Sequence, residues 1–344
     1  MKVELEEIVK PLLEWYQENR RMLPWREDKN PYYVWLSEIM LQQTRIEAVK
    51  EYYARFLAEL PTIQELAEVE EEKLLKLWEG LGYYNRARNL KKAGQKIMQE
   101  YDGEMPKKYE DILTLPGIGE YTAGAISSIC FNEKVLAIDG NVLRVISRIV
   151  ASKKDILLLA TKKEIAKKLE KIIPEEAGNF NEALMELGET ICIPNGKPQC
   201  EKCPLQTFCL AKKKGLIEEI PVREKKAKRK VEEKVVFILR HGERVAVQKR
   251  EEKGLLAGMY QFPNEKGDKT KKQIEEILKK WNLKAKRIRE VGKAVHIFSH
   301  IEWHMTGYEI QVEAENEIFE WITKEQLENN FAIPTAFAKW KKII

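Results

Sequence analysis

Apolar residues recur at helical spacings over roughly the first 190 residues of the chain. Leu66, Val69, Leu74 and Leu77 show such a face. Asn30 followed by Pro31 is a good helix start, because Asn can cap a helix and Pro suits its first position. We predict helices over residues 32–59, 65–77, 87–100, 109–113, 121–131, 142–150, 162–172 and 180–187. Strand signals are scarce in this part.

The pattern changes after the last cysteine. Residues 211–234 are charged and poorly periodic, and five of the six residues from Lys225 to Lys230 are basic. This segment is either a solvated linker or a DNA-facing patch, and the pattern alone does not choose. From Val235 onward the sequence predicts strands in VVFIL, RVAVQK, HIFSHIEWHMTGYEIQV and IFEWI, with a helix over 271–281. An α+β domain of about 110 residues is expected there.

Composition excludes several classes of protein. Of 344 residues, 44% are hydrophobic and 33% are charged, which is typical of a folded globular chain. No apolar run approaches the roughly 20 residues that span a bilayer. The acidic start MKVELEEIVK lacks the apolar stretch of a signal peptide, so we expect a reducing, intracellular compartment without structural disulfides. The net charge of +5 permits a polyanionic partner without requiring one.

Four of the five cysteines lie within 18 residues, in the pattern C-x7-C-x2-C-x5-C. Thiolates this close in sequence suit one metal centre, and the candidate ligands are Cys192, Cys200, Cys203 and Cys209. Four cysteines can bind either zinc or an iron–sulfur cluster. Most structural zinc sites use two close cysteine pairs, and only Cys200 and Cys203 form one here.

Two carboxylates and one hairpin are the other candidates for chemistry. Glu38 has many apolar sequence neighbours, so burial could raise its pKa and favour the protonated form that a general acid needs. Asp139 is placed to cap the helix that follows it. Gly117 and Gly119, in LPGIG, permit close backbone approach just before a helix, where a phosphate fits physically. Taken alone, each is more commonly an ordinary surface, cap or turn residue. Because all four histidines lie beyond residue 240, chemistry in the first 240 residues must proceed without a histidine base.

The segment LPGIGEYTAGAI resembles the helix-hairpin-helix of the DNA glycosylase superfamily that includes endonuclease III. The hairpin, IDGNV and the cysteine cluster occur in that superfamily's order. More narrowly, WLSEIMLQQTR, GLGYYNRARNL and FSH near residue 300 resemble the adenine DNA glycosylase, or MutY, family. The resemblance covers roughly residues 5–340. It implies a [4Fe–4S] cluster on the four cysteines, although the family's first cysteine gap is usually six residues and here it is seven.

The resemblance also implies roles for individual residues. Glu38 aligns with the catalytic acid and Asp139 with the catalytic carboxylate, while Tyr121 and Asn141 match residues that orient Asp139 and stabilise the intermediate. Bifunctional relatives carry a lysine where this chain has Tyr121, so a monofunctional enzyme is expected. Further residues match positions that contact DNA or bases: Arg26 and Glu182 at the adenine pocket, Leu41, Gln43, Thr44 and Tyr83 around the lesion, and Gly117 and Gly119 at a phosphate.

The C-terminal part resembles a Nudix domain through EEKGLLAGMYQFPNE. The R-E-x-x-E-E array that holds Mg²⁺ in Nudix hydrolases is broken, because the matching stretch begins Lys271-Lys272. Binding rather than hydrolysis is therefore expected. Phe298, Ser299 and His300 match the loop that recognises 8-oxoguanine.

We therefore expect a multidomain protein: an all-α helix-hairpin-helix glycosylase core with an iron–sulfur cluster loop, and a C-terminal α+β Nudix-like domain. The expected divisions are a helical catalytic region (1–211), a linker (212–232) and a recognition domain (233–344). The helical region comprises a six-helix lobe at about 25–131 and a second lobe made of the N-terminal helix and about 132–211.

The expected activity is base excision repair: hydrolysis of the N-glycosidic bond of adenine mispaired with 8-oxoguanine or guanine in double-stranded DNA. The enzyme is expected to be monomeric, off the membrane, and in the bacterial cytoplasm at the nucleoid. The alternatives are an endonuclease III-like lyase acting on oxidised pyrimidines, a non-catalytic iron–sulfur DNA-binding protein and a Nudix nucleotide hydrolase.

Overall fold

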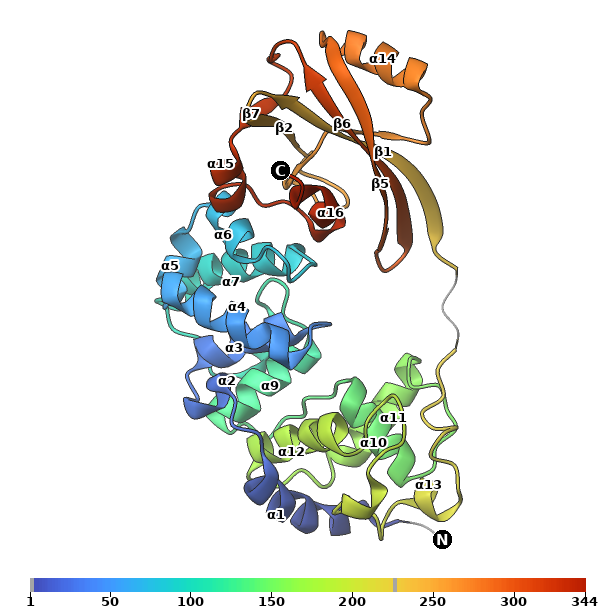
Figure 1. The fold of residues 1–344 in the computed structure, drawn as a ribbon. Coiled ribbons are helices and arrows are strands. Elements are labelled where there is room, and N and C mark those ends of the chain that lie inside the picture. Colours follow the sequence, from blue (N-terminus) through green and yellow to red (C-terminus); the bar gives the residue numbers. More distant parts are fainter. Residues whose placement is uncertain (1–2, 225–227) are drawn as a thin grey trace. The chain divides into compact units, whose positions relative to one another are not determined.

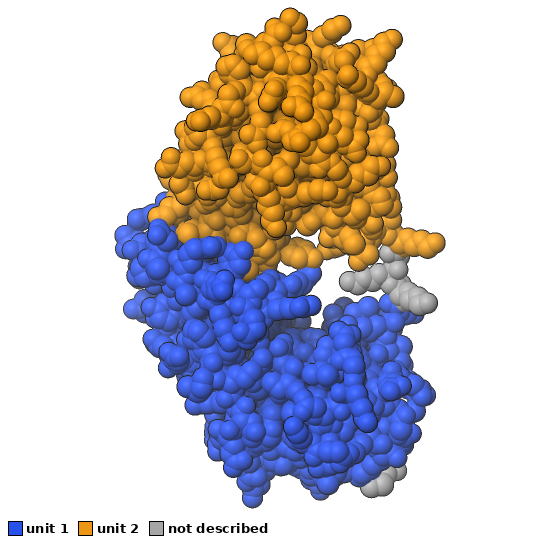
Figure 2. Space-filling model, viewed as in Figure 1, with its two compact units in different colours: residues 1–68, 89–225 blue, residues 69–88, 226–344 orange. Residues whose placement is uncertain are grey.

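The computed structural model describes residues 3–224 and 228–344. The chain divides into two compact units, which Figure 2 shows in different colours. Unit 1 comprises Met1–Glu68 and Asn89–Lys225, and unit 2 comprises Val69–Arg88 and Lys226–Ile344. Within the described residues, no helix combines the length and the apolar character needed to cross a membrane.

The described part of unit 1 is helical apart from one isolated bridge between Asp155 and Val222 (Figure 1). The expected helical character is confirmed, but two long predicted helices are each broken in two, at residues 42–45 and 69–70. The helices up to the hairpin are η1 (Leu5–Ile8), α1 (Val9–Asn19), α2 (Pro24–Glu27), α3 (Pro31–Leu41), α4 (Ile46–Glu59), α5 (Ile63–Glu68), α7 (Asn85–Glu100), which begins in unit 2, α8 (Tyr109–Leu113) and α9 (Glu120–Phe131). Those that follow are α10 (Gly140–Ile149), α11 (Leu159–Leu169), α12 (Ala177–Thr190), η2 (Cys200–Lys202) and α13 (Leu210–Lys213).

Helix α3 starts where the sequence indicates. The Asn30 side chain accepts a hydrogen bond from the Tyr32 backbone N–H at 2.9 Å, and Pro31 occupies the first helical position. Eight of the eleven residues of α3 are buried, so the helix lies inside the unit rather than on its surface. Val34 packs against Ala125 and Ile129 of α9, which brings these two helices together.

Helices α1, α10 and α12 share a second core, which contains Leu12, Ile146, Phe180 and Leu184. Close backbone approach in unit 1 depends on small residues. A Cβ added at Gly124 of α9 would lie 2.0 Å from the Leu136 carbonyl oxygen, in the chain that leads to α10. Glycine is therefore required at this contact.

This contact yields a stability prediction. Gly124→Ala should lower the free energy of unfolding by about 3 kcal/mol or more, because the added methyl group meets backbone rather than a flexible side chain. Urea denaturation followed by circular dichroism measures the change. Gly119→Ala is the matched control, since nothing lies within 4 Å of its Cβ position and its φ is −105°. Equal stability of the two variants would contradict the packing argument.

Unit 2 is built on a mixed seven-stranded sheet in the order β3-β2-β1-β6-β5, with β4 paired to β1 and β7 to β2. β1 and β6 are parallel, and the other pairs are antiparallel. α14 packs on one face through Ile274 and Leu278, and the other face is covered by Phe337 and Trp340 near the C-terminus. The elements are β1 (Lys230–His241), β2 (Arg244–Lys249), β3 (Tyr260–Gln261), β4 (Asn264–Lys266), α14 (Lys271–Lys280), β5 (Ala285–Ile297), β6 (Ile301–Val312), β7 (Glu320–Ile322), α15 (Lys324–Asn329), η3 (Thr335–Phe337) and α16 (Ala338–Lys341).

Residues 69–88, which include α6 (Glu71–Leu77), group with the C-terminal sheet, whereas the sequence pattern placed them in the helical lobe. Polar contacts explain the difference. Arg88 donates to the Ala257 carbonyl at 2.5 Å, and Lys341 pairs with Glu79 at 2.7 Å. Such long-range pairs leave no periodic signal in the sequence.

The segment expected to be a linker is only partly described. Lys225, Lys226 and Ala227 of its basic run lie outside the described residues. Before them, Ile220 is buried and its carbonyl accepts from Arg148 Nε at 2.8 Å. After them, β1 already begins at Lys230. The described residues on either side of the gap thus belong to the folded units.

Candidate active site

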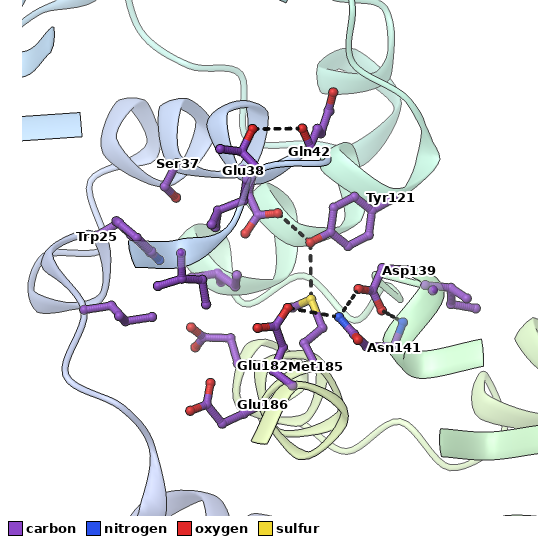
Figure 3. Close-up of a pocket in the computed structure, with 18 of the residues that line it drawn as sticks. Trp25, Ser37, Glu38, Gln42, Tyr121, Asp139, Asn141, Glu182, Met185 and Glu186 are labelled. Atoms are coloured by element: carbon purple, nitrogen blue, oxygen red, sulfur yellow. Dashed lines mark hydrogen bonds between the residues drawn. The ribbon is translucent and has the colours of Figure 1, made fainter. Parts of the chain in front are cut away.

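A cavity of about 920 Å³ in unit 1 is lined by all four residues expected to be catalytic and by several of those expected to contact DNA. Its walls come from α2, the end of α3, the start of α9, the start of α10 and one face of α12 (Figure 3). The predicted site residues that line it are Arg26, Glu38, Leu41, Gln43, Thr44, Tyr121, Asp139, Asn141 and Glu182. Arg26 and Glu182, which are 156 positions apart in the chain, are thus neighbours here.

Glu38 projects from α3 into the cavity and is only 8% exposed. The Tyr121 hydroxyl donates a hydrogen bond to Glu38 Oε2 at 2.6 Å and also lies 3.3 Å from Met185 Sδ. Burial raises the pKa of Glu38 to about 7, the Tyr121 hydrogen bond opposes this rise, and the charge of Glu182 adds to it. Glu38 is therefore protonated in a substantial fraction of molecules at neutral pH, as a general acid requires.

Asp139 is the N-cap of α10 and also lines the cavity. Its expected roles as a helix cap and as a catalytic carboxylate are therefore compatible. Its Oδ1 accepts from the backbone N–H groups of Asn141 and Val142, both at 2.8 Å, and its Oδ2 accepts from Asn141 Nδ2 at 2.7 Å. Burial raises the pKa of Asp139, while these hydrogen bonds lower it. Three donors hold the carboxylate in one orientation with its charge partly satisfied.

Asn141 is itself held in place. Its Oδ1 accepts from Arg144 Nη2 at 2.7 Å, which directs its Nδ2 toward Asp139. A Cβ added at Gly188 of α12 would lie 2.6 Å from the Asn141 Cβ, so this glycine permits the close approach of the two helices. Arg144 also donates to the Cys192 carbonyl at 2.8 Å, which connects this corner of the site to the cysteine segment.

One wall of the cavity is a network of arginines and glutamates. Arg26 pairs with Glu182 at 3.2 Å and with Glu186 at 2.9 Å. Arg21 contacts both carboxylate oxygens of Glu186, at 2.6 and 3.0 Å, and lies 3.6 Å from Glu189. The network fixes the side chains that border the space next to Glu38.

Four further residues that line the cavity were not expected from the sequence: Arg21, Met185, Glu186 and Glu189. A signal was present for the acidic ones, because Glu182, Glu186 and Glu189 recur with helical spacing on one face of α12. Arg21 and Met185 carry no comparable signal, since only the tertiary fold brings them to the cavity.

The residues expected to surround a lesion fall in both units. In unit 1, α3 ends at Leu41, and Gln43 follows with a φ of 61°, an uncommon conformation for a residue other than glycine. In unit 2, Tyr83 has a φ of 48° and is half exposed. Its hydroxyl lies 2.9 Å from Ser299 Oγ, which joins it to the expected 8-oxoguanine loop.

That loop is the tight turn between β5 and β6, rather than part of one continuous strand region. The Phe298 N–H donates to the Ile301 carbonyl at 2.8 Å and closes the turn around Ser299 and His300. The Phe298 ring packs on Trp303, with centroids 4.8 Å apart, and on His296 at 4.5 Å. Ser299 and His300 are left exposed at the tip.

The hairpin glycines connect α8 and α9 in unit 1. Gly117 has a φ of +77°, and its Cβ position would lie 2.6 Å from the Asn89 Cβ, so both backbone conformation and space require glycine. Gly119 is the N-cap of α9 and has open space around it. The first N–H groups of α9 are thus accessible at a surface turn outside the cavity, as a phosphate site requires.

The four clustered cysteines follow α12 in unit 1 and are all partly buried. The pKa of Cys203 is raised to about 12, mainly by burial and partly by the thiols of Cys192, Cys209 and Cys200, so these groups lie within electrostatic range of Cys203. Arg148 Nη1 donates to Cys192 Sγ at 3.2 Å, and the Lys212 N–H donates to Cys209 Sγ at 3.5 Å. Among the described residues, no three histidine, cysteine or acidic side chains are arranged as a ready-made metal site.

The chemistry of this donor set nevertheless fits an anionic thiolate cluster. Buried thiolates that repel one another are stable only when a metal centre neutralises them, and N–H groups directed at sulfur stabilise such a centre. The longer first gap is absorbed locally. Gly196 turns with a φ of +79° and open space around it, and the Gln199 N–H then donates to the Ile191 carbonyl at 3.0 Å.

Comparison with known proteins agrees with this arrangement. Residues 36–175 match the HhH-GPD superfamily of base excision DNA repair proteins, and residues 235–342 match the NUDIX domain. The human adenine DNA glycosylase is 32% identical, covering 95% of this chain and 72% of that protein. The adenine DNA glycosylase of Buchnera aphidicola subsp. Acyrthosiphon pisum is 35% identical, covering 90% of this chain and 87% of that protein.

Solved structures support the helical fold. A thermostable thymine-DNA glycosylase is similar over 61% of this chain and 97% of that chain, with a TM-score of 0.55 and 28% identity. An endonuclease III trapped as a covalent intermediate with DNA is similar over 62% of this chain and 97% of its own, with a TM-score of 0.53 and 25% identity. The expected multidomain fold is thereby confirmed. The chain belongs to the adenine DNA glycosylase family of base excision repair enzymes, which act on N-glycosyl bonds.

Proposed function

We propose that the enzyme removes adenine mispaired with 8-oxoguanine, and less efficiently adenine opposite guanine, by hydrolysis without strand cleavage. The observation that carries the proposal is the convergence of two carboxyl groups, the buried Glu38 and the partly buried Asp139, on one cavity of about 920 Å³. A cavity of this size accommodates one extruded nucleotide.

The chemistry assigns different work to the two acids. Adenine is a poor leaving group until it is protonated, and Glu38, with its pKa raised to about 7, donates the proton to N7. The bond between C1′ and N9 then breaks, and positive charge develops on the deoxyribose. The Asp139 carboxylate stabilises that charge, with transient covalent bonding as in retaining glycosidases. Glu38, now ionised, activates the water that completes hydrolysis.

Neighbouring side chains keep these acids in position. Tyr121 holds Glu38 through its 2.6 Å hydrogen bond, and Asn141 holds Asp139 at 2.7 Å. Arg26 and Glu182, paired at 3.2 Å, border the space for the adenine ring. Preorganised groups of this kind cost no reorganisation when the reaction occurs.

Recognition of DNA is assigned to surface elements of each unit. In unit 1, Leu41, Gln43 and Thr44 lie at the cavity and contact the mispair, and the hairpin of Gly117 and Gly119 holds a backbone phosphate. In unit 2, Tyr83 and the exposed tip residues of the Phe298–His300 turn recognise 8-oxoguanine. The hydrogen bond between Tyr83 and Ser299 supports this pairing of two distant segments.

The assay for this function uses duplexes with 8-oxoguanine·A, G·A and T·A pairs. We expect alkali-labile sites at the adenine in the first two and intact strands before alkali treatment. Strand cleavage without alkali, or a covalent adduct trapped by borohydride, would instead indicate a lyase. Tyr121 supports hydrolysis alone, because its hydroxyl cannot form the Schiff base that a lysine forms.

Ser299→Ala tests the recognition turn. Loss of one hydrogen-bonding hydroxyl should reduce the preference for 8-oxoguanine·A over G·A by about tenfold, since an unmade hydrogen bond costs on the order of 1–3 kcal/mol. Single-turnover rates on the two duplexes give the ratio. The G·A rate is the internal control: an equal decrease on both substrates would argue against a role in recognition.

We further propose that Cys192, Cys200, Cys203 and Cys209 hold a [4Fe–4S] cluster that stabilises the fold of residues 192–209. The purified protein should be brown and absorb near 400 nm, and iron analysis distinguishes this cluster from zinc. Cys203→Ser should lose the absorbance. Cys130→Ser, which changes the one cysteine outside the cluster pattern, should retain it.

A further inference from the structure

Arg223 lies at the catalytic cavity, in a segment whose sequence is compatible with either a solvated linker or a DNA-facing patch. It lines the same cavity as Glu38 and Asp139. Its guanidinium lies beside Gly140, the first residue of α10, because a Cβ added at that glycine would be 4.0 Å from Arg223 Nη2. A cation from the C-terminal end of unit 1 therefore borders the space next to the catalytic carboxylate.

The backbone around Arg223 is firmly held. Val222 forms a parallel bridge with the buried Asp155, and its carbonyl accepts from the Ile156 N–H at 3.2 Å. On the other side, the Glu224 N–H donates to Asp155 Oδ2 at 3.2 Å. Arg148 fixes the preceding Ile220 carbonyl at 2.8 Å. These contacts fix the backbone on both sides of Arg223, whose own side chain is exposed.

The charge of Arg223 has no acidic partner of its own. Within the residues that the structure describes, no carboxylate oxygen lies within 4.0 Å of its guanidinium, whereas the nearby Arg21 and Arg26 are both paired with glutamates. An unneutralised cation here would oppose the positive charge that develops on the deoxyribose. An extruded nucleotide, however, brings phosphates attached to the same sugar that Asp139 faces.

We propose that Arg223 binds a phosphodiester that flanks the extruded adenine nucleotide. The guanidinium can form paired hydrogen bonds with two phosphate oxygens, which would hold the DNA backbone at the cavity and neutralise the arginine at the same time. The inference rests on the proposed function of the cavity, because it requires the nucleotide to enter there.

Arg223→Gln tests the proposal in the full-length enzyme with duplex DNA carrying the mispair. We expect the dissociation constant to rise about tenfold and the slope of log K against log salt to fall by about 0.9, the loss of one phosphate contact. The single-turnover rate at saturating enzyme should change less than about threefold. Lys214→Gln, an exposed lysine of the same segment that does not line the cavity, is the matched control.

Two further variants separate positioning from folding. Arg223→Lys keeps the charge and should retain most of the salt slope. Asp155→Ala removes the side-chain acceptor of the Glu224 N–H but keeps the backbone bridge to Val222, so it should reproduce part of the loss of slope, with faster proteolysis of this segment as its signature. The proposal would be overturned if Arg223→Gln and Lys214→Gln gave the same slope of log K against log salt. So would a faster reaction of Arg223→Gln at saturation, because Arg223 would then oppose the reaction rather than hold DNA. If a Glu38 variant were fully active, the proposed function would be wrong. The comparison of DNA binding by Arg223→Gln and Lys214→Gln would still be valid.

Discussion

Glu38→Gln should abolish adenine release while leaving DNA binding intact, with a decrease of roughly 10²–10⁴-fold in the single-turnover rate. The amide keeps the shape of the side chain, and its oxygen can still accept the hydrogen bond from Tyr121. It cannot donate an acidic proton to the base or activate water afterwards. Release of labelled adenine from the mispaired duplex measures the effect, and a gel-shift titration measures binding. Glu14→Gln, an exposed glutamate of α1 outside the cavity, is the control.

The pH dependence provides an independent check on the same residue. Because burial raises the pKa of Glu38 to about 7, the rate should be level below that pH and fall as the pH rises through it. A rate that rises over this interval would refute Glu38 as the acid.

The raised pKa of Glu38 should also make the free energy of unfolding depend on pH. The folded state holds the Glu38 proton more tightly than the unfolded state, so stability falls between about pH 4.5 and pH 7. Above pH 7 the ionised Glu38 lowers the free energy of unfolding by up to about 3 kcal/mol. Glu38→Gln removes this cost and should be at least as stable as the parent at pH 8. An inactive but stable variant therefore identifies a chemical defect.

Asp139→Asn should lower the rate by about 10³-fold or more, because the carboxylate charge that stabilises the cationic sugar is lost. Asparagine is as good an N-cap as aspartate and can still accept from the Asn141 and Val142 N–H groups. Only the hydrogen bond from Asn141 Nδ2 is lost, so the free energy of unfolding should fall by about 1 kcal/mol or less. Single-turnover kinetics measures the expected loss of rate, and urea denaturation of the same preparation measures the expected small change in stability.

Asp139→Ala separates the two roles of this residue. It removes both the cap and the charge, so it should be as inactive as Asp139→Asn and also less stable by about 1 kcal/mol. If capping were the whole function of Asp139, asparagine would restore activity and alanine would not. Recovery of activity in Asp139→Asn would therefore exclude the proposed electrostatic role.

The sequence by itself determined the local features of this protein. The cap formed by Asn30 and Pro31, the hairpin between α8 and α9, the cap at Asp139 and the change from helices to strands follow from local spacing and residue type. The apolar neighbours of Glu38 on the same short helix are compatible with burial, but only the family resemblance favoured a catalytic acid over an ordinary surface residue. These properties depend on residues within about one or two helical turns of each other, so a local pattern records them.

Only the tertiary structure decided which of these residues lie close together in space. It placed Arg21 and Glu189 in the cavity that contains Glu38 and Asp139, residues 69–88 with the C-terminal sheet, and Arg223 beside Gly140. Each of these placements depends on side-chain hydrogen bonds, ion pairs or close packing between residues far apart in the chain. Charged residues of this kind look like solvent-exposed surface in a sequence, because periodicity reports burial of apolar side chains and carries no information about the partner of a charge.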